Sequence, residues 1–125
     1  MDITPLIKSD IKIIQAYEGG AFKVSGQVYK HAICVSASLV EDFSCNDFKD
    51  ITEACFDLIL SQKDNFDVII LGTGKTQQFF PPELLRSLKS KELHIELMDT
   101  GAACRTYNVL VAEGRRVTAI LLPHQ

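Results

Sequence analysis

The sequence lacks any long apolar run. Its longest apolar strings, such as 68–71, are far shorter than the roughly 20 residues that a membrane-spanning helix needs. Asp2 stands where a secretory leader would carry positive charge, and Lys8, Asp10 and Lys12 interrupt the apolar residues that follow. An Arg-rich organelle presequence is missing as well. We therefore predict a cytoplasmic protein, or one whose leader has already been removed, with no integral membrane segment.

Positive charge is not in excess either. Thirteen Lys and Arg residues stand against sixteen Asp and Glu residues, which gives a net charge of −3. No basic field is therefore available to attract nucleic acid or anionic lipid. With 125 residues, 46% of them hydrophobic, the chain is predicted to fold as one domain over 1–125, without metal or disulfide support.

The four cysteines, Cys34, Cys45, Cys55 and Cys104, form no Cys-x-x-Cys pair, and no histidine stands at zinc-finger spacing. Each cysteine has apolar or small neighbours. We interpret them as reduced and mostly buried small hydrophobic residues. The sequence indicates no metal site and no cofactor.

The first third of the chain is predicted to be antiparallel β-structure. Apolar and β-branched residues fill four short runs: 11–17, 21–24, 27–30 and 33–36. Ser25-Gly26 separates the second from the third and predicts a hairpin turn. The alternation slips between Ile13 and Ile14, which indicates a bulge or a strand covered on both faces.

From residue 46 onward, helical and extended patterns alternate. Asn46 or Asp47 is expected to cap a helix that reaches Gln62, and Asp99 or Thr100 to cap one that Gly114 ends. The other expected elements are strands at 67–71, 93–97 and 117–122 and a helix that begins at Pro81-Pro82. This order predicts an α/β protein, a three-layer sandwich with a β-hairpin elaboration.

No familiar catalytic motif is complete. Gly72-Thr73-Gly74-Lys75-Thr76 lacks the earlier glycine of a phosphate-binding loop, since position 69 is Ile69. A dinucleotide fingerprint lacks its third glycine at Gln77, although Asp99 could sit where such folds bind a ribose. Ser25 lacks the flanking glycines of a nucleophile elbow, and the three histidines are isolated. We assign no catalytic residue.

Polar residues concentrate between positions 96 and 115. Glu96 on a strand and Arg105 on the next helix could form a desolvated pair that fixes the packing of the two elements. The alternative is a ligand or partner site at the carboxyl end of the sheet, where α/β folds bind ligands. The candidate residues for such a site are Gly72, Thr73, Gly74, Glu96, Asp99, Thr100, Arg105 and Asn108.

Phe79 and Phe80 precede two prolines. The residue before a proline is extended, so the two rings should point in opposite directions. Either both are covered by the following helix, or one enters the core and the other forms part of an apolar contact patch.

One set of residues resembles a known family. The pattern is Gly72-x-Gly74, Pro82, Glu96-x-Met98-x-Thr100, Ala103-Cys104-Arg105-Thr106-Tyr107-Asn108-x-Leu110 and Glu113-Gly114-Arg115-x-Val117. It resembles, over essentially the whole chain, the small domain family that includes mitochondrial respiratory complex I assembly factor 3. The resemblance implies a three-layer fold with a mixed central sheet and an inserted hairpin. It also implies a non-enzymatic assembly role exerted by binding a partner protein.

Two functional hypotheses follow. The first is a protein-binding assembly module, linked to respiratory complex I; the sequence leaves a homo-oligomer open. The second is a small-ligand binder or enzyme that uses the Gly72–Gly74 loop and the Asp99–Asn108 segment. An open crevice where these residues converge would favour the second hypothesis, and a filled surface the first.

Overall fold

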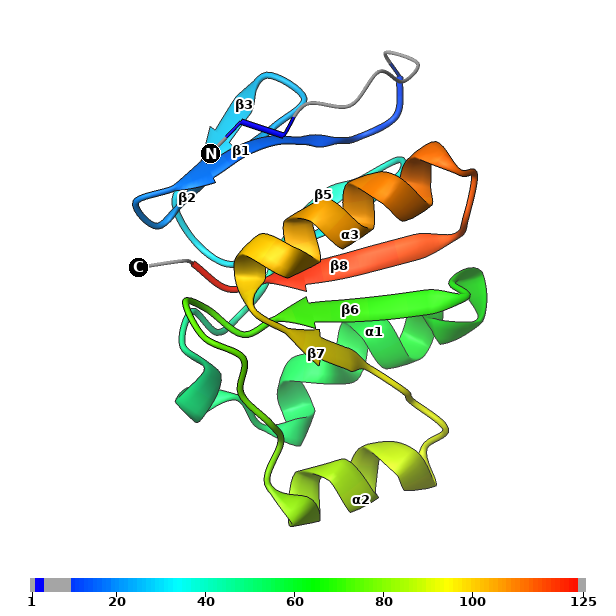
Figure 1. The fold of residues 1–125 in the computed structure, drawn as a ribbon. Helices are drawn as coiled ribbons and strands as arrows, with labels where there is room; N and C mark the ends of the chain where they lie inside the picture. Colours follow the sequence, from blue (N-terminus) through cyan, green and yellow to red (C-terminus); the bar gives the residue numbers. More distant parts are fainter. Residues whose placement is uncertain (1, 4–9, 124–125) are drawn as a thin grey trace.

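The centre of the protein is a mixed five-stranded sheet. A computed structural model describes residues 2–3 and 10–123 (Figure 1). The strand order is β5-β4-β8-β6-β7. The strands are β4 (Ile33–Ser36), β5 (Val40–Asp42), β6 (Val68–Gly72), β7 (Glu96–Met98) and β8 (Val117–Leu121). β6 is parallel to β7 and β8, whereas β4 is antiparallel to β5 and β8. The predicted mixed sheet is confirmed.

Both faces of this sheet are covered. Successive residues of β6 serve opposite faces: Ile70 belongs to one hydrophobic cluster, and Ile69 and Leu71 belong to another. The helix α3 (Thr100–Ala112) packs on the Ile70 face, and α1 (Asp57–Gln62) and α2 (Pro82–Ser90) lie on the other (Figure 1). Coverage on both sides explains the uninterrupted apolar runs of the central strands.

A second, three-stranded sheet forms part of the α3 side. It consists of β1 (Ile14–Glu18), β2 (Ala21–Val24) and β3 (Gln27–Tyr29), joined antiparallel in that order. The expected hairpin is confirmed: Ser25 and Gly26 have φ values of 46° and 89°, as a tight two-residue hairpin turn requires. The predicted irregularity is a register shift between Ile14 and Ala16.

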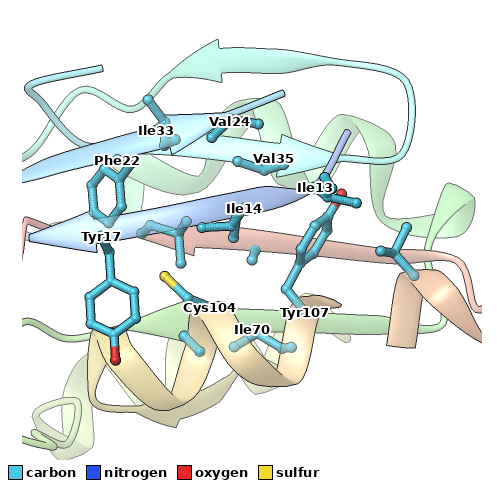
Figure 2. Packing of buried hydrophobic residues seen from close by; sticks show 14 of the residues in the cluster. Ile13, Ile14, Tyr17, Phe22, Val24, Ile33, Val35, Ile70, Cys104 and Tyr107 are labelled. Carbon is cyan, nitrogen blue, oxygen red and sulfur yellow. The ribbon is translucent and has the colours of Figure 1, made fainter. Parts of the chain in front are cut away.

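This small sheet shares a hydrophobic cluster with α3 and the large sheet. Figure 2 shows Tyr17 and Phe22 of the small sheet in one cluster with Cys104 and Tyr107 of α3. Phe22 is 1% exposed and Tyr107 is fully buried. The predicted hairpin elaboration therefore covers part of the core.

The expectation of one continuous helix from residue 46 or 47 to Gln62 is wrong. The segment forms short 3₁₀ turns at Phe48–Asp50 (η1) and Glu53–Phe56 (η2), then α1, then a third turn at Lys63–Asn65 (η3). Asp47 caps only the first turn, because Ile51 and Thr52 return to extended backbone angles. The apolar residues of the segment recur with a helical period, but this period does not show that the helix is interrupted at Ile51 and Thr52.

The remaining elements lie close to their predicted positions. The helix α2 begins at Pro82, and α3 is capped by Asp99, whose Oδ1 accepts a hydrogen bond from Ala102 N. Three differences concern strands: β1 covers 14–18 where 11–17 was expected, β7 covers 96–98 where 93–97 was expected, and β5 was not expected. β5 carries Glu41 and Asp42, so its composition gives a weak strand signal.

Candidate functional site

The predicted site begins where β6 meets the first turn of α3. Thr100 is fully buried. Its hydroxyl accepts a hydrogen bond from Gly74 N at 2.8 Å and donates one to Leu122 O at 2.7 Å. Thr100 N donates to Gly74 O at 2.9 Å. Thr100 therefore joins the loop after β6 to the end of β8 and the start of α3.

Gly72 allows this close approach. A Cβ atom on Gly72 would lie 2.8 Å from the Cα of Thr100 and 3.0 Å from the Cβ of Ala103. Contacts of this length with backbone are not tolerated without a shift, so the glycine lets the strand and the helix touch. The space beside Gly72 is therefore filled by the first turn of α3.

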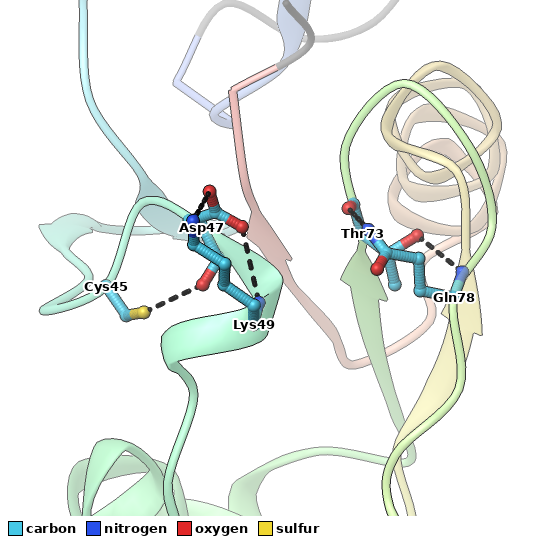
Figure 3. A network of polar contacts seen from close by, with 5 residues as sticks. All are labelled: Cys45, Asp47, Lys49, Thr73 and Gln78. Carbon is cyan, nitrogen blue, oxygen red and sulfur yellow. Dashed lines mark hydrogen bonds and ion pairs between the residues drawn. The ribbon is translucent and has the colours of Figure 1, made fainter.

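The loop after Gly72 is held by its own hydrogen bonds. Thr73 is 2% exposed, and its hydroxyl donates to Thr76 O at 2.7 Å and accepts from Gln78 N at 3.1 Å. The side-chain amide of Gln78 donates to Thr73 O at 3.2 Å (Figure 3). The loop is thus closed on itself by the polar groups of Thr73 and Gln78.

The polar residues of α3 face the first strand. The Asn108 amide accepts a hydrogen bond from Ile14 N at 3.0 Å and donates one to Ile14 O at 2.8 Å. The Tyr107 hydroxyl donates to Lys12 O at 2.8 Å. Asn108 is 4% exposed, so this candidate site residue is buried between α3 and the first strand. The adjacent Tyr-Asn pair attaches α3 to β1.

Arg105 contributes to the same attachment from the surface. Its Nη1 donates to the hydroxyl of Tyr17 at 2.7 Å. Gly101 leaves room for this tyrosine, because a Cβ there would lie 2.6 Å from the Tyr17 hydroxyl oxygen. Glu96 is an exposed residue of β7, and the ion pairs among the described residues do not join it to Arg105. The predicted Glu96–Arg105 pair is therefore wrong.

The two adjacent phenylalanines have opposite environments. Phe80 is 8% exposed and stacks on Phe48 with ring centroids 5.6 Å apart, and it meets Phe56 edge-on at 5.8 Å. Phe79 is 73% exposed. The arrangement with one ring in the core and one at the surface is the second of the two expected from the sequence.

A wide depression lies at the other end of the sheet. It measures about 560 Å³, and its lining includes Leu39, Phe66 and Val117 together with Ser36 and Arg115. Sequence reasoning missed it, because its walls come from the start of β8, the end of β4 and the loop before β5. Of its lining, Gly114, Arg115 and Val117 belong to a motif that the sequence singled out, Glu113-Gly114-Arg115-x-Val117.

Two further observations concern the described part of the chain. Across residues 2–3 and 10–123, no three His, Cys, Asp or Glu side chains gather as metal ligands would. Over the same residues, no helix is long and apolar enough to cross a membrane.

Comparison with known proteins gives named relatives. The chain is 31% identical over 111 residues to the Bos taurus NADH dehydrogenase [ubiquinone] 1 alpha subcomplex assembly factor 3. The matched region covers 88% of this chain and 60% of the bovine protein. It is 32% identical over 108 residues to the 13 kDa major membrane protein of Francisella tularensis, covering 85% of this chain and 86% of that one. The chain thus spans about 60% of the length of the bovine assembly factor.

Solved structures share the fold. A Bordetella parapertussis protein, 35% identical, superposes with a TM-score of 0.79 over 90% of this chain and 96% of that chain. A structure described as an outer membrane protein from Bartonella henselae, 30% identical, superposes with a TM-score of 0.81 over 94% and 98%. A family model described as a protein of unknown function, DUF498/DUF598, matches residues 14–122. The resemblance seen in the sequence is thereby confirmed, and the chain belongs to the DUF498/DUF598 family.

Proposed function

We propose that this protein is a non-enzymatic binding module that takes part in assembling a respiratory complex by contact with a partner protein. Relatives named complex I assembly factors support an assembly-related role at the level of the family. That this chain binds a protein partner, and that the partner belongs to a respiratory complex, are both part of the proposal. It includes a cytoplasmic location, from which contact with a membrane complex would bring the protein to a membrane surface.

The polar residues of the predicted site favour this proposal over small-ligand chemistry. Thr73, Thr100 and Asn108 are buried, and their side chains are hydrogen-bonded to the backbone of the same chain. A ligand could engage these groups only by displacing bonds that hold the fold together. The end of the site around Thr73 and Thr100 is therefore filled, which favours the binding module, whereas Arg105 and Asn108 border a depression of about 550 Å³ on the outer side of α3.

The single observation that carries the proposal is the exposure of Phe79 on a held loop. Its ring is 73% exposed, whereas its neighbours are fixed: Gln78 by two hydrogen bonds to Thr73, and Phe80 by stacking on Phe48. An aromatic side chain on a pre-organised segment is the type of group that contributes most to protein interfaces, because little entropy is lost on binding.

The test is capture of respiratory NADH dehydrogenase subunits from the native cell by the tagged chain. Phe79→Ser should lower the recovery of these subunits about tenfold and change the free energy of unfolding by less than about 0.5 kcal/mol. Leu58→Ser is the matched control, because Leu58 is an exposed apolar residue of α1. Phe80→Ser should instead destabilise the fold by about 3 kcal/mol, since it empties a core site.

Two outcomes would contradict the proposal. Equal recovery by the wild type, Phe79→Ser and Leu58→Ser would show that Phe79 is not the contact. Absence of respiratory subunits from the wild-type capture would refute the respiratory partner. Light scattering on the same variants shows whether the partner is a second copy: a dimer that Phe79→Ser dissociates would replace the proposed heterologous contact.

A further inference from the structure

One row of residues along α3 faces solvent. Arg105 and Val109 belong to the helix and Glu113 caps its carboxyl end, and all three are exposed. They follow one another at intervals of four positions, so they lie on the same side of the helix. Val109, at the middle of the row, is 57% exposed. The row therefore presents an apolar side chain between a cation and an anion.

The depression of about 550 Å³ on the outer side of α3 lies beside this row. Besides the row itself, its lining includes Ile3, Asn108 and Ala112. Ile3 is partly buried and is joined to the first strand by the hydrogen bond from Ile3 N to Gln15 O at 2.9 Å. The amide of Asn108 is bonded to the backbone of Ile14, so it is not free to bind a ligand. The surface that the depression offers is therefore mainly apolar.

The charges at the two ends of the row indicate what covers the depression. Among the described residues, neither Arg105 nor Glu113 has an ion-pair partner. The hydroxyl of Tyr17 accepts from Nη1 of Arg105, and a guanidinium has further N–H donors that can bind a carboxylate. Glu113 lies at the carboxyl end of α3, where a negative charge opposes the helix dipole. Its charge therefore does not stabilise its own helix.

A second copy of this chain carries the complementary charges. Arg105 stands four positions before Val109 and Glu113 four positions after it. If two copies of α3 lie antiparallel across a two-fold axis near Val109, Arg105 of each copy therefore lies opposite Glu113 of the other. A parallel alignment would place like charges opposite each other. Rows at intervals of four positions are also the ridges that pack together in the commonest class of helix contact, with a crossing angle of about −50°.

We propose that α3 binds α3 of a second copy in a symmetric antiparallel dimer. Val109 of each copy enters the depression of the other, where the small side chain of Ala112 leaves room, and Arg105 pairs with Glu113 across the axis. Burial of the apolar surface drives association, and the charges fix its orientation. The expected Kd is about 50 µM, because one helix face gives an interface at the low end of the size range.

The dimer is separate from the folding of each copy. Both hydrophobic clusters are made within one chain, so the monomer stays folded when the dimer dissociates. Chemical unfolding at a protein concentration well below the Kd therefore measures the monomer alone. The proposal does not depend on the proposed function, because Phe79 does not line the depression.

The test is sedimentation velocity of the full chain between about 5 and 500 µM, which spans the range from tenfold below to tenfold above the expected Kd. The wild type should change from mainly monomer to mainly dimer over this range. Val109→Lys should stay monomeric at every concentration, because it places two like charges at the two-fold axis. Circular dichroism checks that each variant is folded.

Charge exchange tests the antiparallel alignment. Glu113→Arg and Arg105→Glu should each raise the Kd at least about tenfold, because like charges then lie opposite each other. An equimolar mixture of these two variants should dimerise with a Kd within about threefold of the wild-type value, since each positive position of one variant then faces a negative position of the other. Glu83→Arg is the matched control and should keep the wild-type Kd, because Glu83 is an exposed residue of α2 that does not line the depression.

Three results would overturn the proposal. A wild type that is monomeric at the highest concentration would show that no second copy binds. A dimer whose Kd is unchanged by Glu113→Arg and Val109→Lys would show that another surface forms it. Two folded charge variants that do not associate when mixed would refute the antiparallel alignment. Val109→Lys and Glu113→Arg decide the first two questions even if Arg105→Glu, which loses the bond to Tyr17, does not fold.

Phe79→Ser separates this proposal from the proposed function. It should leave the dimer intact, because the α3 face does not include Phe79. Loss of respiratory subunits from the capture with an unchanged dimer would therefore concern the Phe79 contact alone. A monomeric wild type that still recovers these subunits would refute the dimer and leave the proposed function standing.

Discussion

Asn108 takes the place of a strand beside β1. One edge of β1 pairs with β2. At Ile14, the side-chain amide of Asn108 accepts a hydrogen bond from the backbone N–H and donates one to the backbone C=O. Backbone groups that are buried without a partner cost free energy comparable to a lost hydrogen bond. A single side chain therefore fixes the position of the small sheet against α3.

We predict that Asn108→Ala lowers the free energy of unfolding by about 2–3 kcal/mol, because it leaves both backbone groups of Ile14 without partners. Urea unfolding followed by circular dichroism measures the change. Val109→Ala is the matched control: Val109 is the next residue of the same helix and is 57% exposed, so the expected change is below about 0.5 kcal/mol. Equal stability of the two variants would contradict the role given to Asn108.

The sequence predicted which residues of the site are polar but not where they point. Asn108 and Ile14 are 94 residues apart in the chain, so no local pattern couples them. A polar residue on a helix is usually solvated, and only the tertiary position of β1 makes this one buried. The opposite environments of Phe79 and Phe80 were easier to predict. The extended geometry before a proline and the alternation of side chains along an extended segment both depend on local sequence.

At the scale of elements, the best predictions were those with two independent signals. The helix α3 has an apolar period together with a capping Asp99 and a terminating Gly114, whose φ is 78°. β6 and β8 have apolar runs too short for helices. The segment from 46 to 62 has the period and a capping residue at its start only, and its extended residues, Ile51 and Thr52, are β-branched. Residues of this type prefer extended geometry, which is the signal that the periodicity concealed.

The broken segment is held against α2 by one carboxylate. Glu53 of η2 pairs with Lys91 and accepts a hydrogen bond from the hydroxyl of Ser87 on α2. The Lys91 ammonium, followed by the Ser87 hydroxyl, lowers the pKa of Glu53 from its ordinary value of 4.5. A carboxyl whose pKa is lower in the folded state stabilises the fold above its unfolded pKa, and this contribution disappears as the pH falls through the folded pKa.

We therefore expect Glu53→Gln to lose stability at neutral pH and to show a shallower decrease in stability than the wild type between about pH 5 and pH 3. Chemical unfolding at a series of pH values measures both slopes. Glu113→Gln, at the exposed carboxyl end of α3, removes a charge of the same sign and should keep the wild-type slope. A slope unchanged by Glu53→Gln would show that the contact between η2 and α2 does not depend on the ionised carboxylate.

For the whole molecule, the central question is whether the two sheets are one folding unit. The two hydrophobic clusters are separated by the large sheet, and β6 and β8 contribute residues to both. Tyr17, Phe22 and Val24 of the small sheet belong to the same cluster as Ile70 and Leu121 of the large one. The predicted single domain implies that neither sheet retains a closed core without the other.

This arrangement predicts one cooperative unfolding transition. Native-state hydrogen exchange should give the paired amides of β1 and β2 an opening free energy within about 1 kcal/mol of that of the β6 and β8 amides. The apolar side chains of the small sheet are buried in the cluster that it shares with α3 and the large sheet, so opening the small sheet would expose Tyr107 and Ile14 and remove the cover of α3. An opening free energy for β1 and β2 several kcal/mol lower than that of β8 would show instead that the small sheet unfolds separately. In that case the hydrogen bonds of Asn108 would hold a local attachment and not the global fold, and Asn108→Ala would lower the protection of β1 and β2 while leaving that of β6 and β8 unchanged.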